Sequence, residues 1–117
     1  PRDEISMTEV HDCFSITELV TMEDLQLSVE GGAVKDVLDG VFDAGGAIPC
    51  QIDGGLKCFG HPIGASGIRM LYEMYLQLQG RAGERQLANP RIGLTHNLGG
   101  QPSQNVCSIS IVGREKL

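Results

Sequence analysis

The pattern of apolar and polar residues predicts three β-strands in the chain. The first covers Ile5–Val10, near the N-terminus. The other two lie near the C-terminus: Ile92–His96 has the apolar character of a buried strand, and Asn105–Val112 alternates cleanly. Between them, Asn97–Pro102 contains a Gly-Gly pair and a proline, which suit a tight connection. We therefore expect the last two strands to form an antiparallel pair.

Two helices are predicted by apolar residues that recur every three or four positions. The first ends near Leu25, and either Asp12 or Ser15 can serve as its N-cap. In the second, the apolar residues at helical spacing run from Ile68 to Leu78, and Gly80 is expected to end the helix. It is the more clearly defined of the two.

The remaining segments carry weaker signals. Within residues 28–53, Val34–Phe42 lies between two Gly-Gly pairs and suits either a short helix or an irregular excursion. Residues 80–91 are mostly polar and suit a surface connection. The order strand, helix, loop, helix, strand, strand predicts an α/β fold in which helices pack on a mixed sheet. With 117 residues, the chain is expected to form a single domain, 1–117.

Composition and charge narrow the choice of partners. The formal net charge is −6, and the lysines and arginines form no cluster. Nucleic acid and anionic membrane surfaces are therefore not expected as partners. No apolar run approaches the length of a membrane-spanning helix.

The four cysteines are expected to be reduced thiols. No secretory signal precedes them, and the apolar content makes disulfides unnecessary for folding. This favours a cytoplasmic location. Cys50 and Cys107 lie among apolar residues, and we assign both to packing.

The central feature of the sequence is the glycine-rich stretch 54–67, in which His61 lies between a glycine and Pro62. Pro62 disfavours helical backbone at His61, so the imidazole is expected in extended chain just before the second long helix. Gly60, Gly64 and Gly67 allow the backbone to turn or to approach another group closely. A helix N-terminus favours negative charge, so His61 is placed where an oxyanion or a thiolate could be stabilised.

Five side chains could carry chemistry: His11, Cys13, Cys58, His61 and His96. Each alone is more often structural than catalytic. Together, the pairs His11/Cys13 and Cys58/His61 could form a two-Cys, two-His zinc site. The spacing of the pairs is not that of zinc fingers, and Pro62 and the glycines would have no purpose there, so zinc is the weaker alternative.

Thiol chemistry is the stronger alternative. Cys13 lies at a helix start, a position that lowers the pKa of a thiol. If the fold brings His61 beside Cys13, a thiol base and imidazole donors would converge on one point. Such a site suits removal of a proton next to a carbonyl, and it suits acyl transfer to a cysteine equally well.

Two motifs resemble those of the thiolase family. Residues 60–67, GHPIGASG, resemble the thiolase GHPxGxxG signature, and residues 11–14, HDCF, are similar to a motif of the archaeal and sterol-carrier-type branch. The likeness extends from about Ile5 to Val112. Conventional thiolases carry Asn-Glu-Ala-Phe in place of HDCF, and Cys-x-Gly in place of residues 96–98.

The resemblance implies a role for each matching position. His61 would activate the acylated nucleophile and donate to a thioester oxygen, and His11 would complete that oxyanion site. Cys13 would act as the acid/base at the α-carbon. The backbone N–H near Leu98 would contribute to a second oxyanion hole, and Gly64 would lie in the substrate-binding region. No catalytic role passes to His96 or Cys58.

The resemblance also implies that the chain matches an incomplete C-terminal half. The nucleophilic cysteine of thiolases lies in an N-terminal half, supplied either by the same polypeptide or by a partner. The leading hypothesis is the C-terminal catalytic portion of an acyltransferase that forms or cleaves β-ketoacyl-coenzyme A, with acyl-CoA as substrate and no metal or redox cofactor. The alternatives are a thiolase-like aldolase subunit and a non-catalytic binding module. Without its N-terminal half the chain would be inactive, and the complete protein would be a homo-oligomer.

Overall fold

A three-stranded mixed sheet forms the centre of the molecule. The computed structural model describes residues 2–115. The strands are β1 (Met7–Val10), β2 (Ile92–Gln101) and β3 (Gln104–Gly113), in the spatial order β1-β2-β3. β1 pairs with β2 in parallel, and β2 pairs with β3 in antiparallel register. The α/β fold with a mixed sheet, predicted from the element order, is confirmed.

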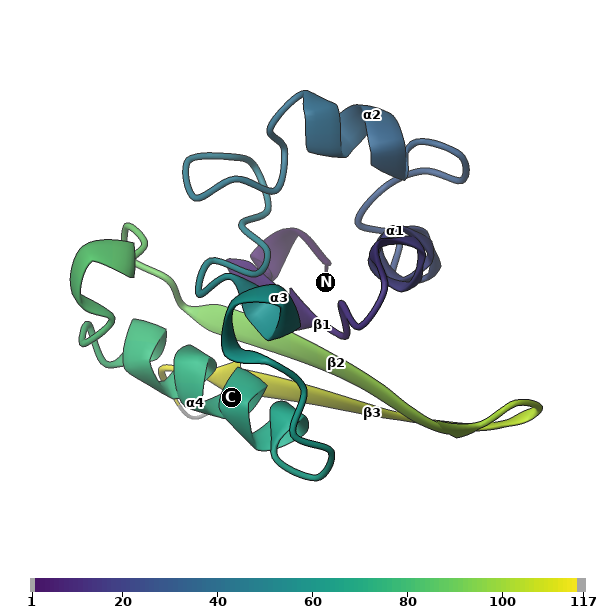
Figure 1. The fold of residues 1–117 in the computed structure, drawn as a ribbon. Helices are drawn as coiled ribbons and strands as arrows, with labels where there is room; N and C mark the ends of the chain where they lie inside the picture. The colour runs from purple at the N-terminus through teal and green to yellow at the C-terminus, as the bar shows by residue number, and fades with distance from the viewer. Residues whose placement is uncertain (1, 116–117) are drawn as a thin grey trace.

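Helices cover both faces of the sheet (Figure 1). α4 (Ser66–Leu78) packs along β2 on one face. The other side carries α1 (Ser15–Asp24), α2 (Ala33–Leu38) and the short α3 (Gly55–Phe59). Two single 3-10 turns complete the structure, at Arg2–Glu4 and Gly83–Arg85. No helix within residues 2–115 is long and apolar enough to cross a membrane.

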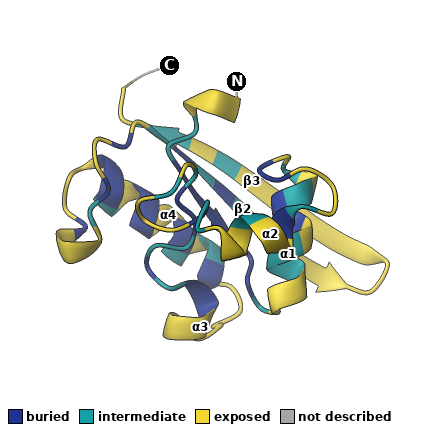
Figure 2. Ribbon diagram, turned by 90° about the horizontal axis from the view of Figure 1, so that it is seen from above, coloured by how far each residue is buried: buried dark blue, intermediate teal, exposed yellow. Residues whose placement is uncertain are grey.

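Two apolar clusters hold the layers together, and β1 contributes to both. Val10 packs with Met22 of α1 and with Phe42, whereas Met7 packs with Met74 of α4. Successive side chains of a strand point to opposite faces, so one buried strand supplies both cores. All four residues of β1 are buried, and Figure 2 shows this buried centre in dark blue.

The second and third strands differ from the prediction. β2 continues to Gln101, so residues 97–101 are strand and not connection, and the turn is confined to Pro102 and Ser103. Ser103 takes a φ of +65° to close it. The resulting hairpin extends beyond the helices in Figure 1 and is exposed at its end in Figure 2. Cys107 is exposed on this hairpin, so its assignment to packing was wrong, whereas Cys50 is buried in the core as predicted.

The start of α1 also corrects a prediction. Phe14 occupies the N-cap position, and no side chain caps this end of the helix. Asp12 is instead turned toward α3, as described below. The helix itself, from Ser15 to Asp24, lies where the spacing predicts it.

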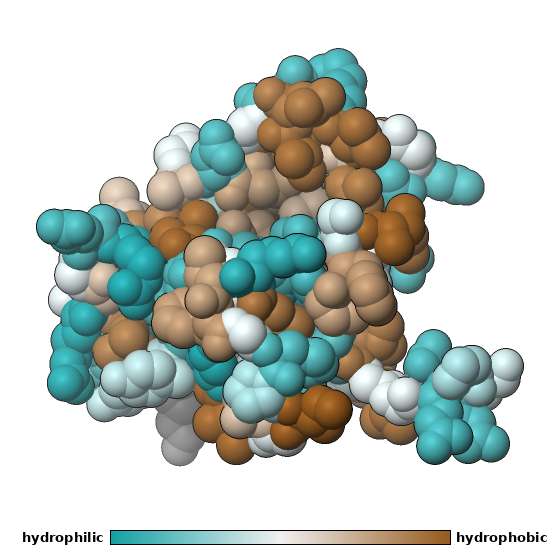
Figure 3. Space-filling model, viewed as in Figure 1, coloured by the Kyte–Doolittle hydropathy of each residue, from teal (hydrophilic) through white to brown (hydrophobic). Residues whose placement is uncertain are grey.

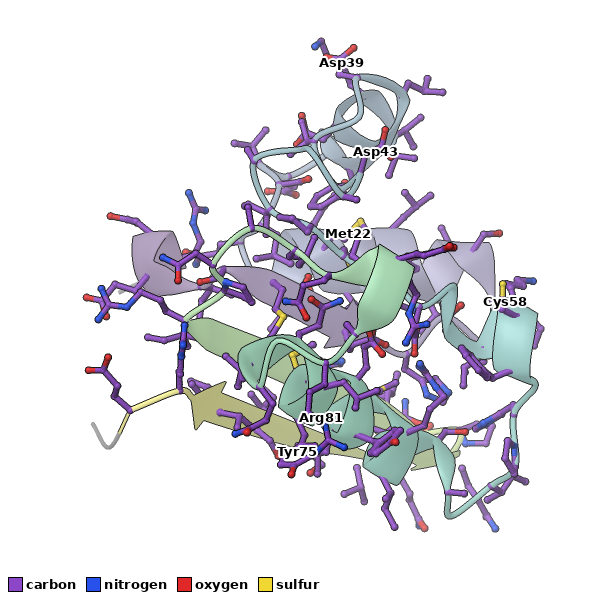
Figure 4. All side chains as sticks on the ribbon, turned by 90° about the vertical axis from the view of Figure 1, so that its left-hand side faces the viewer. Met22, Asp39, Asp43, Cys58, Tyr75 and Arg81 are labelled. Carbon is purple, nitrogen blue, oxygen red and sulfur yellow. The ribbon has the colours of Figure 1, made fainter. Side chains whose placement is uncertain are left out.

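The segment between α1 and the central loop is a folded excursion. α2 forms within it, and Phe42 anchors the segment to the core. Figure 4 shows Asp39 and Asp43 at its outer end, away from the sheet. Figure 3 shows apolar side chains gathered over α2, where Val34 and Leu38 are exposed.

Candidate active site

The HDC segment is held in place by a glutamine side chain. Gln51 Oε1 accepts from the N–H of Val10 at 3.1 Å, and Gln51 Nε2 donates to the carbonyl of Val10 at 2.9 Å. The side chain thus continues the pairing that Thr8 makes with the backbone of residues 49–51, on the outer edge of β1. This clamp fixes the residue that immediately precedes His11.

Asp12 connects the segment to α3. Its Oδ1 accepts from the N–H of Leu56 at 2.9 Å, and its Oδ2 accepts from the N–H of Lys57 at 3.4 Å. These are free donors of the first helical turn, so Asp12 caps a helix that lies more than forty residues along the chain. Gly55 has a φ of +59°, and a Cβ there would lie 2.5 Å from Asp12 Oδ2, so the cap requires glycine at this position.

His61 lies in the loop between α3 and α4, at the N-terminus of α4, as predicted. Its Nδ1 is 2.7 Å from the hydroxyl of Ser66, the first residue of the helix. The Ser66 hydroxyl also donates to the carbonyl of Pro62 at 3.3 Å. Since that hydroxyl proton is used, His61 Nδ1 donates to Ser66 Oγ, and Nε2 is left for another partner.

The fold brings His11 and His61 together. Their ring centroids are 4.9 Å apart and the ring planes meet at 76°, an edge-on contact. His11 is buried, with 5% of its surface exposed, whereas His61 is exposed. Burial lowers the pKa of His11, and the neighbouring imidazole of His61 lowers it further; a hydrogen bond to Asn97 opposes both effects.

A cleft of about 660 Å³ opens beside the two histidines. Cys13, Gly64 and Leu98 line it together with His11 and His61, so the structure places all five proposed site residues around one space. Cys13 is half-buried, and its Sγ is 3.9 Å from Thr17 Oγ1. Apolar side chains of the cleft wall come from the start of α4 and the loop before it, at Ile63, Ile68 and Leu71.

Two other side chains that could carry chemistry by residue type, Cys58 and His96, lie outside this cleft. Cys58 is exposed on α3, at the edge of the molecule in Figure 4. His96 is paired with Val10 across β1 and β2, on the face of the sheet opposite Asn97. Its Nδ1 is buried and has no hydrogen-bond partner among the described residues. Within residues 2–115 no three His, Cys, Asp or Glu side chains gather as metal ligands, so the zinc alternative has no geometric support.

Behind the cleft, Arg69 of α4 joins the two histidine-bearing segments. Its guanidinium pairs with Glu9 at 3.0 Å and also with Asp53, just before α3. It lies 5.5 Å from the centre of the Phe59 ring. Burial raises the pKa of Glu9 to about 7, and Arg69 counteracts only part of that effect.

Comparison with known proteins identifies the family. A family model described as "Thiolase C-terminal domain-like" matches residues 1–112. The chain belongs to this family. It is 45% identical over 97 residues to an acetyl-CoA acetyltransferase of Methanothermobacter thermautotrophicus, a match that covers 83% of the chain. It is 44% identical over 98 residues to sterol carrier protein 2 of Oryctolagus cuniculus, over 82% of the chain.

The structure also resembles a solved aldolase. A chain of an Ltp2-ChsH2(DUF35) aldolase superposes with a TM-score of 0.77 over 97% of this chain, at 19% sequence identity, which shows a shared fold. The match covers 28% of that chain. The chain likewise spans 25% of the acetyltransferase and 18% of the sterol carrier protein.

Three residues that support the site were not identified from the sequence: Gln51, Arg69 and Asn97. Gln51 and Arg69 act across the fold, on a strand edge and on two distant carboxylates, and nothing in their local sequence marks these contacts. Asn97 follows His96 in a segment predicted to be a turn. Extending the alternation of β2 by one residue would have placed Asn97 on the α4 face, beside the histidine that follows β1.

Proposed function

We propose that this thiolase C-terminal domain supplies the oxyanion-binding and acid/base side of an active site that forms or cleaves β-ketoacyl-CoA. The observation that carries the proposal is the contact between His11 and His61 on the wall of a cleft that Cys13 also lines. The relatives named acetyl-CoA acetyltransferase support the same reaction class.

In this proposal the two imidazoles bind the thioester oxygen of an acyl-CoA. Hydrogen-bond donors aimed at an oxygen on which charge develops stabilise the enolate more than the neutral thioester. Because Nδ1–H of His61 is held by Ser66, Nε2 is the nitrogen left for this role, and it donates when the ring is protonated. Partial burial of the site strengthens the interaction relative to water.

Cys13 is proposed as the acid/base. As a thiolate it takes the α-proton of an acyl-CoA, and the electron pair moves onto the thioester oxygen to give the enolate. The enolate carbon then attacks the carbonyl of an acyl group carried on a cysteine. That carbon–carbon bond forms as the carrier thiolate leaves. In the cleavage direction the Cys13 thiol returns the proton.

The nucleophilic cysteine is proposed to come from an N-terminal thiolase half, in the same polypeptide or in a partner. The backbone N–H near Leu98 and the loop at Gly64, both on the cleft wall, are proposed to contact the acyl and substrate groups. Coenzyme A thioesters serve as substrates, and the mechanism uses no metal or redox cofactor. Homo-oligomerisation of the complete protein is part of the same proposal.

The test uses Cys13→Ala in the polypeptide or complex that carries the nucleophile. Exchange of the α-proton of acetyl-CoA with deuterated solvent should fall by about 10²–10⁴-fold, while acylation of the nucleophile continues. Cys107→Ala is the matched control, because Cys107 is exposed on β3 and outside the cleft. Equal loss of exchange and acylation, or exchange unaffected by the Cys13 change, would refute the assignment.

A further inference from the structure

Asn97 lies between the two elements that carry the site. It belongs to β2, one position past the residue that pairs with Val10, and its side chain faces α4. On one side, its Oδ1 is 3.0 Å from His11 Nδ1. On the other, its amide nitrogen lies against the backbone of Gly67 in the first turn of α4. Neither the family match nor the reaction proposed above assigns a role to this residue.

The hydrogen bond determines which nitrogen of His11 carries the proton. An amide oxygen can only accept, so the proton of a neutral His11 lies on Nδ1, and Nε2 keeps its lone pair. We propose that Asn97 is a positioning residue that fixes neutral His11 in its Nδ1–H form, so that Nε2 becomes a hydrogen-bond donor only when the ring is protonated. This inference rests on the proposed function for its catalytic meaning, although the tautomer itself can be measured without turnover.

The geometry keeps the amide in place. A Cβ at Gly67 would lie 2.9 Å from Asn97 Nδ2 and 3.3 Å from Cγ, closer than side chains normally approach. Gly67 therefore provides the space that Asn97 occupies, and Asn97 in turn reaches the ring of His11. Gly67 is the last glycine of the glycine-rich stretch 54–67 and lies in the first turn of α4, and its contact with Asn97 gives it a specific purpose.

Several titratable groups surround the ring of His11. His61 meets it edge-on from the loop before α4, and Asp12 follows it on its own segment. His96 precedes Asn97 on β2. The Asp12 carboxylate is already bonded to the backbone of α3, so Asn97 is the direct side-chain partner of Nδ1. Burial lowers the pKa of His11, and the Asn97 hydrogen bond raises it.

The catalytic consequence is a defined pH dependence. The oxyanion role requires a donating Nε2, and with Nδ1 committed to Asn97 this exists only in the imidazolium. Activity should therefore decline as pH rises through the pKa of His11. A variant that raises this pKa should move the alkaline decline to higher pH, and a variant that lowers it should do the opposite.

The test is ¹⁵N NMR of the histidine rings in the unaltered protein. The signals of His11 are assigned by their loss in His11→Gln. In the neutral ring, the shifts should show a protonated Nδ1 and an unprotonated Nε2. Asn97→Asp keeps the shape and an acceptor but adds a charge, and it should raise the pKa of His11 by about one unit or more. Asn97→Leu removes the acceptor, and it should lower the pKa and release the ring to the Nε2–H form.

Gly67→Ala provides an independent variant, because it displaces the amide without altering a polar group, and it should act like Asn97→Leu. A neutral His11 protonated at Nε2 in the unaltered protein would overturn the inference. An unchanged pKa in Asn97→Asp would overturn it too, and this nearly isosteric variant decides the matter if Asn97→Leu fails to fold. Failure of the proposed function would appear separately, in the proton-exchange assay of Cys13→Ala.

Discussion

Glu9 shows how a single buried carboxyl group links the site to the stability of the fold. Its side chain is 1% exposed, lies two residues before His11 and pairs with Arg69 on α4. Burial raises its pKa from an ordinary 4.5 to about 7, and Arg69 opposes part of this shift. Between these two values the folded state binds more protons than the unfolded state. The free energy of unfolding contributed by this group must therefore fall as pH rises.

We predict that Glu9→Gln reduces this pH dependence. The amide stays neutral at every pH and still accepts from Arg69, so the loss of up to about 3 kcal/mol between pH 4.5 and 7 should disappear. Urea unfolding at several pH values measures the slope. His11, whose lowered pKa acts in the opposite direction, is present in both proteins and cancels in the comparison. The exposed Glu84→Gln is the control, and identical slopes in Glu9→Gln and the unaltered protein would contradict the prediction.

At the scale of elements, the contact between α4 and β2 depends on close approach. A Cβ on Gly93 of β2 would lie 2.2 Å from Met74 Sδ and 3.0 Å from Met7 Cε. Met74 and Met7 are both essentially buried in the second core cluster, so neither side chain can move without disturbing others. The missing side chain at Gly93 therefore allows the helix to pack directly over the strand pair.

We predict that Gly93→Ala destabilises the protein by about 1–3 kcal/mol through overpacking. The change would be measured as a shift in the urea midpoint. Gly99→Ala is the matched control: it lies on the same strand, and its added Cβ would meet nothing within 4 Å. Gly93→Ala combined with Met74→Ala should destabilise the protein by less than the sum of the two single changes, because the shorter side chain makes room for the added Cβ. Equal stability of the two glycine variants would show that α4 is free to shift.

Local sequence predicted the elements in which apolar residues repeat regularly. It failed where a group distant in the sequence determines the structure. The helix over 68–78 and the first strand follow from spacing alone. The cap of α1 was misassigned because Asp12, a good local N-cap, is used by the backbone of α3 instead. The short α3 itself was missed, since five residues carry too little periodicity and its start depends on that distant carboxylate.

The same distinction applies to the site. His11, Cys13 and His61 stood out because residue type and motif single them out, and the fold places them around one cleft. The residues that hold them are common types in unremarkable surroundings. Gln51 clamps Val10 only because the chain returns to the edge of β1 after some forty residues, and Asn97 reaches His11 only because β2 extends further than its pattern suggests.

For the whole molecule, the sheet presents an uncovered surface at β3. Within residues 2–115, β3 pairs only with β2, so the other edge of β3 is open. Ile109 and Ile111 pair with His96 and Leu94 on the face opposite α4, yet they are 53% and 57% exposed. Neighbouring α1 and α2 do not reach over this part of the sheet. An open strand edge beside exposed isoleucines favours pairing with another chain.

We predict that the 117-residue chain alone self-associates through this strand. Light scattering during size-exclusion chromatography should show a mass that rises with concentration. Ile109→Lys, alone or combined with Ile111→Lys, should shift the chain toward monomer, because a charge on the strand resists burial and edge pairing. Val29→Lys also introduces a lysine, at a residue that is 77% exposed but distant from the sheet, and it should leave the association unchanged.

A monomeric chain at all concentrations, or equal association of the Ile109 and Val29 variants, would contradict the prediction. Addition of a thiolase N-terminal half should suppress self-association only if that half covers the same surface.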